Sequence, residues 1–581
     1  MSKNKESEIQ KKRHSLSHVM AAAVLDIFDE ARLAIGPAIE NGFYYDFDLP
    51  RTLIPEDLLK IEAKMKEIIS SEISFIKREE DAKRALKKEK ASGDIYKAEL
   101  ITDLMSEGTK KVTYYKSGDF EDLCVGPHVN STKDLRGVAF KLTKIAGAYW
   151  RGNEKNKMLQ RIYAVAFENQ KKLDDYLKKI EEAEKRDHRK LGQELDLFSF
   201  NDAAVGFVFW HPGGMILKNE LVSYWRKEHL RVGYKEVETP IILNESLWHK
   251  SGHWDNYKDN MYFTKIDNQQ SAIKPMNCPG GILIYKSRMR SYRDLPLRVA
   301  ELGLVHRHEL SGVLHGLFRV RSFVQDDAHI YCTEDQVEKE LASTIKLIEK
   351  IYKKFGFKDY HIELSTRPQK SIGTDQMWNK AEKTMKKVSR DLNLKIKINE
   401  GDGAFYGPKF DFHINDSIGR TWQCGTIQLD FSMPERFELE YVGKDGKKKR
   451  PVMIHRTVLG SLERFIGILI EHYAGAFPLW LAPVQLSIIS VGAFSKKYAK
   501  DVYKELLSEG YRVELRDENE TVGKKIREAE LQKIPYMIVV GEKEAKSESV
   551  AVRTLHDKKI KNLKKSVFMK EIKKELENQI E

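Results

Sequence analysis

The chain has 581 residues, of which 41% are hydrophobic and 32% are charged, a composition that excludes a disordered chain and a membrane protein alike. At roughly 150 residues per domain, this length corresponds to about four folding units. The 100 lysines and arginines exceed the 87 acidic residues and give a formal net charge of +13. That surplus favours a polyanionic partner such as nucleic acid, although a generally lysine-rich composition explains it equally well.

Neither an export signal nor a membrane span is visible in the sequence. The first 15 residues are polar, and the most apolar region, residues 465–494, is interrupted by Glu471, His472, Pro478 and Pro483. The four cysteines form no CxxC pair and are too sparse for a disulfide scaffold. We therefore expect a cytoplasmic protein that makes no membrane contact.

In the first 170 residues the amino-acid composition and the predicted secondary structure change several times. Residues 14–28 predict a helix, and residues 35–50, rich in glycine, proline and aromatic side chains, predict turns and strands. Residues 55–90 predict highly charged helix. Strand-like pieces follow at residues 113–128 and 147–152.

An amphipathic helix is predicted next. Leu173, Tyr176, Leu177 and Ile180 recur at steps of three and four residues among lysines and glutamates. Gly192 can end this helical region. We interpret it as a connector between domains, and the alternative is an ordinary surface helix of either neighbour.

Two regions with different patterns of predicted secondary structure follow. Between residues 198 and 480, aromatic and β-branched runs alternate with helical ones, which predicts a mixed or antiparallel sheet with flanking helices. After Pro483, short apolar strands at residues 484–491, 511–516 and 536–541 are separated by charged helical segments. This alternation predicts a small, parallel-rich α/β domain.

One group of candidate site residues lies near the N-terminus. His14 and His18 are four residues apart on the predicted helix and therefore share a face, and Cys124 and His128 lie in the segment CVGPH. Together they can form a tetrahedral zinc site or a metal-free polar pocket that positions water. Two unrelated surface histidines are the third interpretation.

A second group is rich in arginine. Arg307, Arg319 and Arg321 occur with Glu309, Gln325, Asp327 and His329 in segments whose alternation permits two paired strands. A guanidinium held on a strand presents a planar fork to a phosphate. We therefore predict a binding site for an anion here.

A strand carrying His455 runs into Gly460-Ser461 and then into a helix with Arg464 in its first turn, which also favours a phosphate. Cys278 lies in KPMNCPGG, where its spacing alone indicates little. The sequence contains neither GxxxxGK[ST] nor a well-placed GxGxxG, so a bound ATP would be held by arginines.

These residues resemble a known family. Arg307-His308-Glu309 followed by Arg319 resembles motif 2 of the class II aminoacyl-tRNA synthetases, residues 460–464 (GSLER) resemble motif 3, and Pro240 resembles the motif 1 proline. The surrounding segments, among them GHWDNYKD, QDDAHIYC, WQCGTIQLDF and IHRTVLGSLERFIGIL, are similar to threonyl-tRNA synthetases. The similarity covers essentially the whole chain.

The resemblance implies an α+β multidomain protein: a class II core built on a seven-stranded antiparallel sheet with helices, an N-terminal α+β editing domain and a C-terminal α/β anticodon-binding domain. We assign residues 1–168 to editing, 169–197 to a helical linker, 198–481 to the catalytic core and 482–581 to anticodon binding. Many bacterial members begin with a ubiquitin-like domain, and because HSLSH begins at His14 we expect that domain to be missing here.

The resemblance also implies a mechanism in which ATP and L-threonine form a threonyl-adenylate. One Zn²⁺ per subunit is expected on Cys278, His329 and His455, and Mg²⁺ accompanies ATP. Arg307 is the expected α-phosphate contact, Glu309 the adenine contact and Arg464 the γ-phosphate contact, with Arg319 and Gln423 also binding ATP. Threonine is expected at Met276, Asp327, Tyr406 and Gln428, and further catalytic roles are expected for His253, Gln325 and Lys409.

Discrimination against serine predicts a second activity. Serine differs from threonine by one methyl group, which gives roughly 10–200-fold selectivity, so hydrolytic editing of seryl-tRNA is expected. The resemblance implies editing without metal by five residues: His14, His18, Asp122, Cys124 and His128. It places the contacts with the anticodon of threonine tRNA at Asn519, Arg527, Glu544 and Arg553, and it implies a homodimer through motif 1.

Two other functions compete with this interpretation. A non-catalytic tRNA- or RNA-binding relative would have lost Arg307, Arg464 or the three zinc ligands, and all of them are present. A zinc-dependent hydrolase centred on His14 and His18 leaves the arginine-rich segments unexplained.

Overall fold

The computed structural model describes residues 2–416 and 418–580, which divide into two compact units, residues 1–181 and 182–581. The boundary falls inside helix α5 (Gln170–Lys185), the amphipathic helix that the sequence predicts. Leu173 is its buried residue. No described helix combines the length and hydrophobicity that a bilayer crossing requires.

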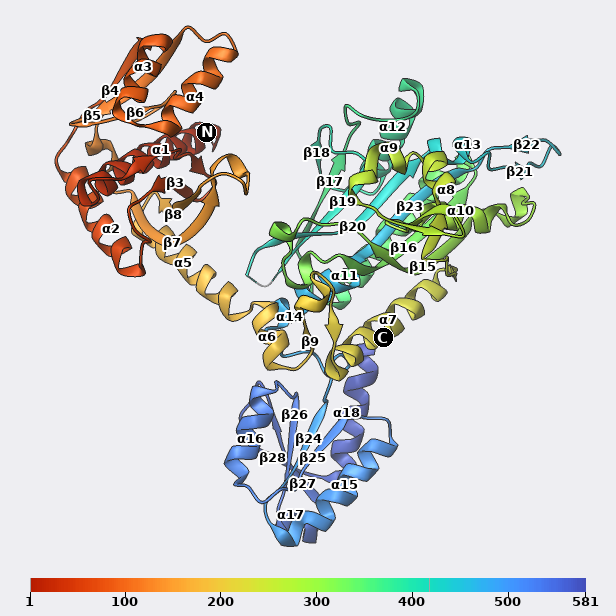
Figure 1. Ribbon diagram of the computed structural model, residues 1–581. Helices are drawn as coiled ribbons and strands as arrows, with labels where there is room; N and C mark the ends of the chain where they lie inside the picture. Colours follow the sequence, from red (N-terminus) through yellow and green to blue (C-terminus); the bar gives the residue numbers. More distant parts are fainter. Residues whose placement is uncertain (1, 417, 581) are drawn as a thin grey trace. The chain divides into compact units, whose positions relative to one another are not determined.

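The N-terminal unit contains two antiparallel sheets and four helices before α5 (Figure 1). The larger sheet has the order β1 (Arg32–Leu33), β3 (Gly42–Asp48), β8 (Met158–Phe167), β7 (Ala139–Tyr149), with β2 (Ala38–Ile39) paired to β3. α1 (Ser2–Ile27) and α2 (Pro55–Ser70) pack on it, and their apolar faces form one core with Phe43, Tyr45 and Phe47. His14 and His18 therefore lie on a helix whose apolar face is fixed in the core.

The smaller sheet corrects one expectation. Its strands are β4 (Phe75–Asp81), β5 (Lys111–Ser117) and β6 (Phe120–Leu123), next to α3 (Ala82–Ser92) and α4 (Ile95–Ser106). The predicted helix over residues 55–90 was therefore wrong at β4. This strand carries mostly exposed charged side chains and is paired on one side only, so it lacks the apolar alternation of a half-buried strand.

In the second unit, the central sheet has eight strands rather than the seven that the resemblance implies. Their order is β11 (Lys235–Glu236), β15 (Leu297–His306), β16 (Ser322–Cys332), β23 (Val452–Ser461), β20 (Thr421–Asp430), β19 (Lys409–Asn415), β17 (Tyr360–Ser365), β18 (Ile396–Asn399). The two outermost pairs are parallel and all inner pairs are antiparallel. The predicted mixed sheet is thus confirmed.

The two faces of this sheet have different roles because successive residues of a strand point to opposite sides. Ala328, Ile330 and Ile454 belong to the large apolar core, together with residues of α7 (Pro212–Arg231), α11 (Val337–Lys354), α12 (Asp375–Asp391) and α14 (Leu462–Tyr473). The alternate residues carry the polar side chains. Residues of α8 (Glu245–Ser251), α10 (Cys278–Lys286) and α13 (Ser432–Arg436) pack against that face, next to Tyr331 and Met453. The other short elements pack with α8 or pair with one another: α9 (His253–Tyr257), β12 (Ile242–Asn244), β13 (Tyr262–Ile266) and β14 (Gln269–Ile273).

The remaining short elements of this unit are α6 (His188–Glu194), β9 (Phe198–Ser199), β10 (Phe209–Trp210), β21 (Tyr441–Val442) and β22 (Lys448–Lys449). Gly192 lies within α6 and does not end it, contrary to the prediction. The Phe198 ring lies where a Cβ at position 192 would be, at 2.3 Å, so the glycine serves a close contact.

The last hundred residues form a separate five-stranded sheet, shown at the bottom of Figure 1. Its order is β25 (Val513–Arg516), β24 (Leu486–Ser490), β26 (Tyr536–Val540), β27 (Ser549–Thr554), β28 (Lys561–Lys564), with helices α15 (Lys496–Ser508), α16 (Val522–Leu531), α17 (Glu542–Ser547) and α18 (Lys565–Ile580). The three predicted strands are parallel, as expected. The antiparallel β27 and β28 were not predicted.

Candidate active site

Three buried side chains from different elements converge on the polar face of the large sheet. Cys278 begins α10, while His329 of β16 and His455 of β23 are direct cross-strand partners. Their ligand atoms lie within 4.8 Å of one another. His455 Nε2 is 2.9 Å from the Asp430 carboxylate, whereas the buried His329 Nε2 has no hydrogen-bond partner among the described residues.

The surroundings of these three residues suit a divalent cation. Burial and the nearby Asp327 and Asp430 carboxylates raise the pKa of the Cys278 thiol well above its usual value, and burial lowers the pKa of the His329 imidazole. A cation offsets the raised thiol pKa, since it stabilises a thiolate and accepts a neutral imidazole. One thiolate and two imidazoles, one of them oriented by a carboxylate, match a zinc centre with a position left open for substrate.

A cavity of about 290 Å³ opens beside Cys278 and His455. It is lined by the four residues for which threonine binding is expected: Met276, Asp327, Tyr406 and Gln428. The Tyr406 hydroxyl donates to the Gln428 side chain, and Asn277 donates to Asp327 at 3.2 Å. Burial raises the pKa of Asp327 to about 6. The cavity therefore combines a buried carboxylate with oriented polar groups.

A second cavity, of about 280 Å³, adjoins the first, and both are lined by Arg307, Gln325, Thr426 and Thr457. The remaining expected ATP contacts line it as well: Glu309, Arg319, Gln423 and Arg464. Three guanidinium groups thus surround a polar hollow, which favours a polyphosphate.

Fixed contacts with the backbone hold these arginines. Arg464 Nε donates to the Phe318 carbonyl at 3.0 Å, and Arg307 Nε donates to the Pro275 carbonyl at 3.2 Å. Arg307 lies one residue beyond β15, so it and Glu309 do not share a strand face. The Glu309 N–H instead donates to the Arg307 carbonyl at 2.9 Å, in a turn.

Sequence reasoning missed the residue that shapes the turn before Arg464. Thr457 is opposite Asp327 and Ser461 is opposite Gln325, so the three residues between them in β23 face Asp326 alone. The buried Asp326 carboxylate accepts the N–H groups of Val458, Leu459 and Gly460 at 2.8–3.1 Å. The Ser461 hydroxyl then accepts the Arg464 N–H at 3.2 Å and caps α14.

Two predicted catalytic residues stand apart from the cavity walls. His253 is fully buried, with its ring nitrogens 2.7 Å from Ser251 Oγ and 3.0 Å from Met276 Sδ, so it lies behind a lining residue. Lys409 is the cross-strand partner of Gln428 and pairs with Asp411 at 2.5 Å. The roles expected for both remain predictions.

The N-terminal unit brings together His14, His18, Cys124 and His128. Cys124 Sγ is 3.3 Å from both His14 Nε2 and His128 Nε2, and His18 Nε2 is 3.6 Å from Asp122. Burial lowers the pKa of His14, His18 and His128, the last to about 2, and raises that of Cys124 to about 11. At neutral pH the group therefore consists of neutral imidazoles and a neutral thiol.

The four residues expected to contact the anticodon do not form one bonded group. Asn519 and Arg527 are exposed, the Glu544 carboxylate accepts the Gly541 N–H at 2.8 Å, and Arg553 pairs with Glu530 at 2.5 Å.

Comparisons with known proteins agree with this arrangement. Residues 112–163 match the threonyl and alanyl tRNA synthetase second additional domain, residues 262–473 match the tRNA synthetase class II core domain (G, H, P, S and T), and residues 485–575 match the anticodon binding domain. The threonine–tRNA ligase of Carboxydothermus hydrogenoformans is 59% identical over 541 residues, 93% of this chain and 84% of that protein. That of Clostridium tetani is 56% identical over 568 residues, 98% of this chain and 88% of that protein.

The chain belongs to the threonine–tRNA ligase family.

Solved structures of this family share the fold. The RNA binding domain of threonyl-tRNA synthetase from Cryptosporidium parvum is 41% identical, with a TM-score of 0.65 over 67% of this chain and 98% of that chain. The threonyl-tRNA synthetase ThrRS-1 of Aeropyrum pernix, described as putative, is 30% identical, with a TM-score of 0.60 over 68% of this chain and 96% of that chain. The class II core and the editing-related domain that the sequence predicts are therefore confirmed.

In the editing-related unit of this ligase, two further residues join the histidine–cysteine group. The Tyr45 hydroxyl donates to Asp122 at 2.5 Å, and the buried Lys97 ammonium pairs with the same carboxylate. Lys97 lies on α4 and Tyr45 on β3, at positions far from the CVGPH and HSLSH segments. No local sequence pattern connects them, so only the fold reveals the contact.

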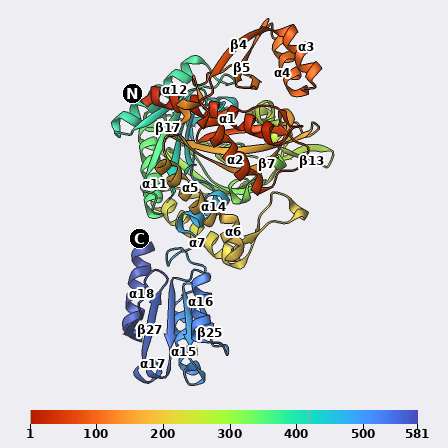
Figure 2. The same ribbon diagram turned by 90° about the vertical axis from the view of Figure 1, so that its left-hand side faces the viewer.

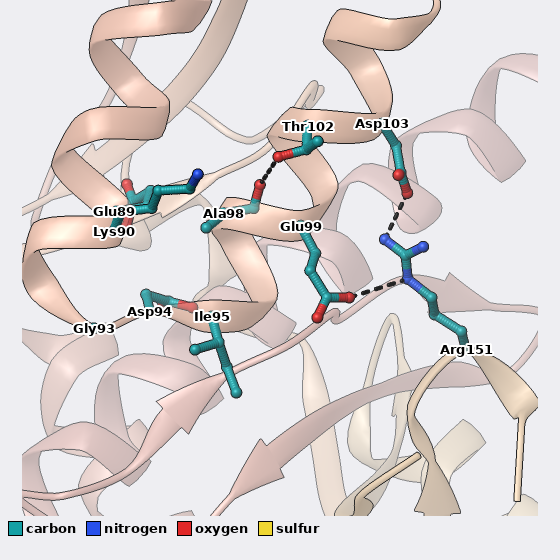
Figure 3. Close-up of a pocket in the computed structure, with 10 residues that line it drawn as sticks. All are labelled: Glu89, Lys90, Gly93, Asp94, Ile95, Ala98, Glu99, Thr102, Asp103 and Arg151. Carbon is teal, nitrogen blue, oxygen red and sulfur yellow. Dashed lines mark hydrogen bonds and ion pairs between the residues drawn. The ribbon is translucent and has the colours of Figure 1, made fainter. Parts of the chain in front are cut away.

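A further cavity lies apart from both groups. It has a volume of about 570 Å³ and lies where Arg151 faces α3 and α4, and its wall includes Glu89, Asp94 and Ile95 (Figure 3). The guanidinium of Arg151 already pairs with Glu99 and Asp103.

Proposed function

We propose that this chain joins L-threonine to threonine tRNA in two steps, and that it hydrolyses mischarged seryl-tRNA in its N-terminal unit. ATP is consumed in the first step, which forms a threonyl-adenylate, and the second step transfers the threonyl group to the tRNA and releases AMP. The observation that carries the first activity is the junction of two cavities at Arg307 and Gln325. One cavity is lined by the Arg464 side chain, and the other by Cys278 and His455. An amino acid bound in one cavity and ATP bound in the other could therefore place the carboxylate next to the α-phosphate.

In the first step, the threonine carboxylate oxygen attacks the α-phosphorus, a threonyl-adenylate forms and pyrophosphate leaves. Arg307, at the junction, stabilises the charge on the α-phosphate, and Arg464 holds the γ-phosphate. The Glu309 carboxylate accepts a hydrogen bond from the adenine amino group. Phosphoryl chemistry requires orientation and charge stabilisation more than covalent help from the protein, and these fixed arginines supply both.

Selection of threonine is assigned to Cys278, His329 and His455, which would hold Zn²⁺. When bound, the ion would act as a Lewis acid toward the amino and hydroxyl groups of the amino acid. Valine lacks the hydroxyl, and a site built around such a group rejects the analogue that lacks it by about 10⁴–10⁵-fold, far more than an apolar pocket does. The Asp327 carboxylate, which lines the cavity, accepts a hydrogen bond from the amino group of threonine.

Editing is assigned to His14, His18, Asp122, Cys124 and His128. Their neutral imidazoles accept hydrogen bonds from water and orient it toward the ester of seryl-tRNA. Tyr45 and Lys97 hold the Asp122 carboxylate in place.

The remaining assignments follow from the family. We propose Mg²⁺ with ATP, a homodimer and a cytoplasmic location. The proposed domains are residues 1–168 for editing, 169–197 as linker, 198–481 for catalysis and 482–581 for anticodon binding.

Threonine-dependent exchange of pyrophosphate into ATP tests the proposed activity. Threonine and, to a lesser extent, serine should support exchange, and valine should not, since it lacks the hydroxyl. Exchange that is equally fast with valine would contradict the proposed basis of selection. No exchange with any of the three would favour the non-catalytic relative.

A further inference from the structure

We infer that Phe494, with Lys496 and Lys497 beside it, is a stacking platform for an unpaired base of the bound tRNA. This inference rests on the proposed function, and it adds an aromatic contact to the four polar residues proposed to bind the anticodon. The partner is the single-stranded loop of a tRNA, because residues 485–575 match the anticodon binding domain.

Phe494 is 89% exposed, the highest value among the large hydrophobic side chains of the described residues. Single exposed apolar residues are common on protein surfaces, so exposure alone indicates little. What distinguishes Phe494 is its position and the groups around it.

Phe494 follows the carboxyl end of β24, the central parallel strand of the C-terminal sheet. β25 pairs with one side of β24 and β26 with the other. The connections that follow β24 and β25 therefore lead to opposite sides of β24, which makes its carboxyl end the point where the strand order reverses. Ligands of α/β sheets bind at such an edge. Asn519 follows β25 and Glu544 lies on α17 after β26, so two proposed anticodon contacts lie at the same edge. Figures 1 and 2 both show α15 and α17 at this end of the domain.

Hydrogen bonds hold the segment that carries the ring. The Val491 N–H donates to the Val540 carbonyl at 3.0 Å, and the Ser495 hydroxyl both accepts from the Gly492 N–H at 3.3 Å and donates to its carbonyl at 3.0 Å. The short helix η9 (Ala493–Ser495) also contacts α17. The aromatic face is thus presented by an anchored turn, which reduces the entropy lost when a base stacks on it.

Positive charge accompanies the ring. α15 begins at Lys496 and Lys497, so two lysines and the positive end of a 13-residue helix follow Phe494 within three residues of the chain. The acidic Asp517 on the neighbouring loop pairs with Lys500 at 3.3 Å. Proteins that bind single-stranded RNA combine an aromatic face for the base with cations for the adjoining phosphates.

The test compares Phe494→Ala, Phe494→Trp and Leu507→Ala in the full-length protein. Leu507 is also exposed, at 50%, but it lies at the far end of α15, away from the proposed tRNA contacts. Loss of one stacked base weakens binding by about 5- to 150-fold. Phe494→Ala should weaken the binding of threonine tRNA by such a factor, whereas Phe494→Trp and Leu507→Ala should retain it, and pyrophosphate exchange should be equal in all four proteins.

A second measurement identifies the part of the RNA that stacks. The indole fluorescence of Phe494→Trp should change on addition of full threonine tRNA, relative to wild type, and not on addition of an acceptor minihelix without an anticodon loop. Unchanged tRNA binding by Phe494→Ala, with normal exchange and charging, would overturn the inference and leave the proposed function intact. Failure of the wild type to charge tRNA would count against the proposed function itself.

Discussion

Cys278 is a buried thiol whose surroundings oppose its ionisation unless a cation is bound. Burial and two carboxylates raise the pKa of its thiol. Serine at this position offers a hydroxyl that ionises still less readily, so Cys278→Ser should lose bound zinc and threonine-dependent exchange. Metal analysis and pyrophosphate exchange check this. Cys332→Ala is the matched control, because Cys332 is also buried but belongs to the apolar core, and it should keep both zinc and exchange.

His14 and His18 lie on one face of α1, within the histidine–cysteine group of the N-terminal unit. Replacing both with alanine removes two water-accepting imidazoles and should leave threonine activation at the wild-type rate while seryl-tRNA accumulates. A deacylation assay with preformed seryl-tRNA measures this. An unchanged rate of deacylation would refute the editing assignment.

Individual residues also show where sequence reasoning reaches its limit. The three proposed zinc ligands could be named only through the family resemblance. In the structure, His329 and His455 are a cross-strand pair, and Cys278 reaches them from α10. Lys97 and Tyr45 could not be named, since their contact with Asp122 depends on the packing of three separate elements. The burial of His253 was equally invisible, because it depends on Met276 and Trp248 packing around the ring.

At the scale of the element, the irregularity in β23 connects the sheet to the phosphate site. Burial raises the pKa of Asp326 to about 6, yet its carboxylate accepts three backbone N–H groups that precede Arg464. Asp326→Asn keeps one carbonyl oxygen and replaces the other by an amide donor that faces these N–H groups. The variant should therefore show a higher KM for ATP and slower exchange.

The pH dependence of stability gives an independent check on Asp326. The folded pKa, about 6, exceeds the usual value of 3.8, so the folded state binds more protons than the unfolded state between these values. As pH falls from 7 to 4.5, wild type should gain roughly 2 kcal/mol of unfolding free energy relative to Asp326→Asn. Denaturation of both proteins at the two pH values measures this gain. A constant difference would show that Asp326 ionises normally.

Predictability from sequence differed between elements for a physical reason. The largely buried strands β16 and β23 contain aromatic and β-branched residues and were expected as parts of a sheet. β4 was not expected, because it buries little and its charged side chains resemble those of a solvated helix. The irregularity at residues 458–460, which lie opposite Asp326, depends on how β16 and β23 are aligned. No local sequence pattern specifies that alignment.

At the scale of the whole molecule, activation and tRNA recognition are assigned to different domains, so variants should separate them. Arg553 lies on β27 and pairs with Glu530. Arg553→Ala should reduce the charging of threonine tRNA and leave pyrophosphate exchange unchanged, because activation needs no tRNA. Arg516→Ala is the control, since Arg516 also forms ion pairs in this domain, with Glu514 and Glu528, and has no proposed RNA contact. A selective loss of exchange in Arg553→Ala would contradict its assignment.

The central claim is that threonine is activated at a centre formed by Cys278, His329 and His455 with a bound metal. The most direct measurement is threonine-dependent pyrophosphate exchange on one preparation before metal removal, after removal and after addition of Zn²⁺, with bound metal quantified each time. Exchange should fall with the metal content and return with Zn²⁺. Full-rate exchange by a protein that contains no metal would contradict the account.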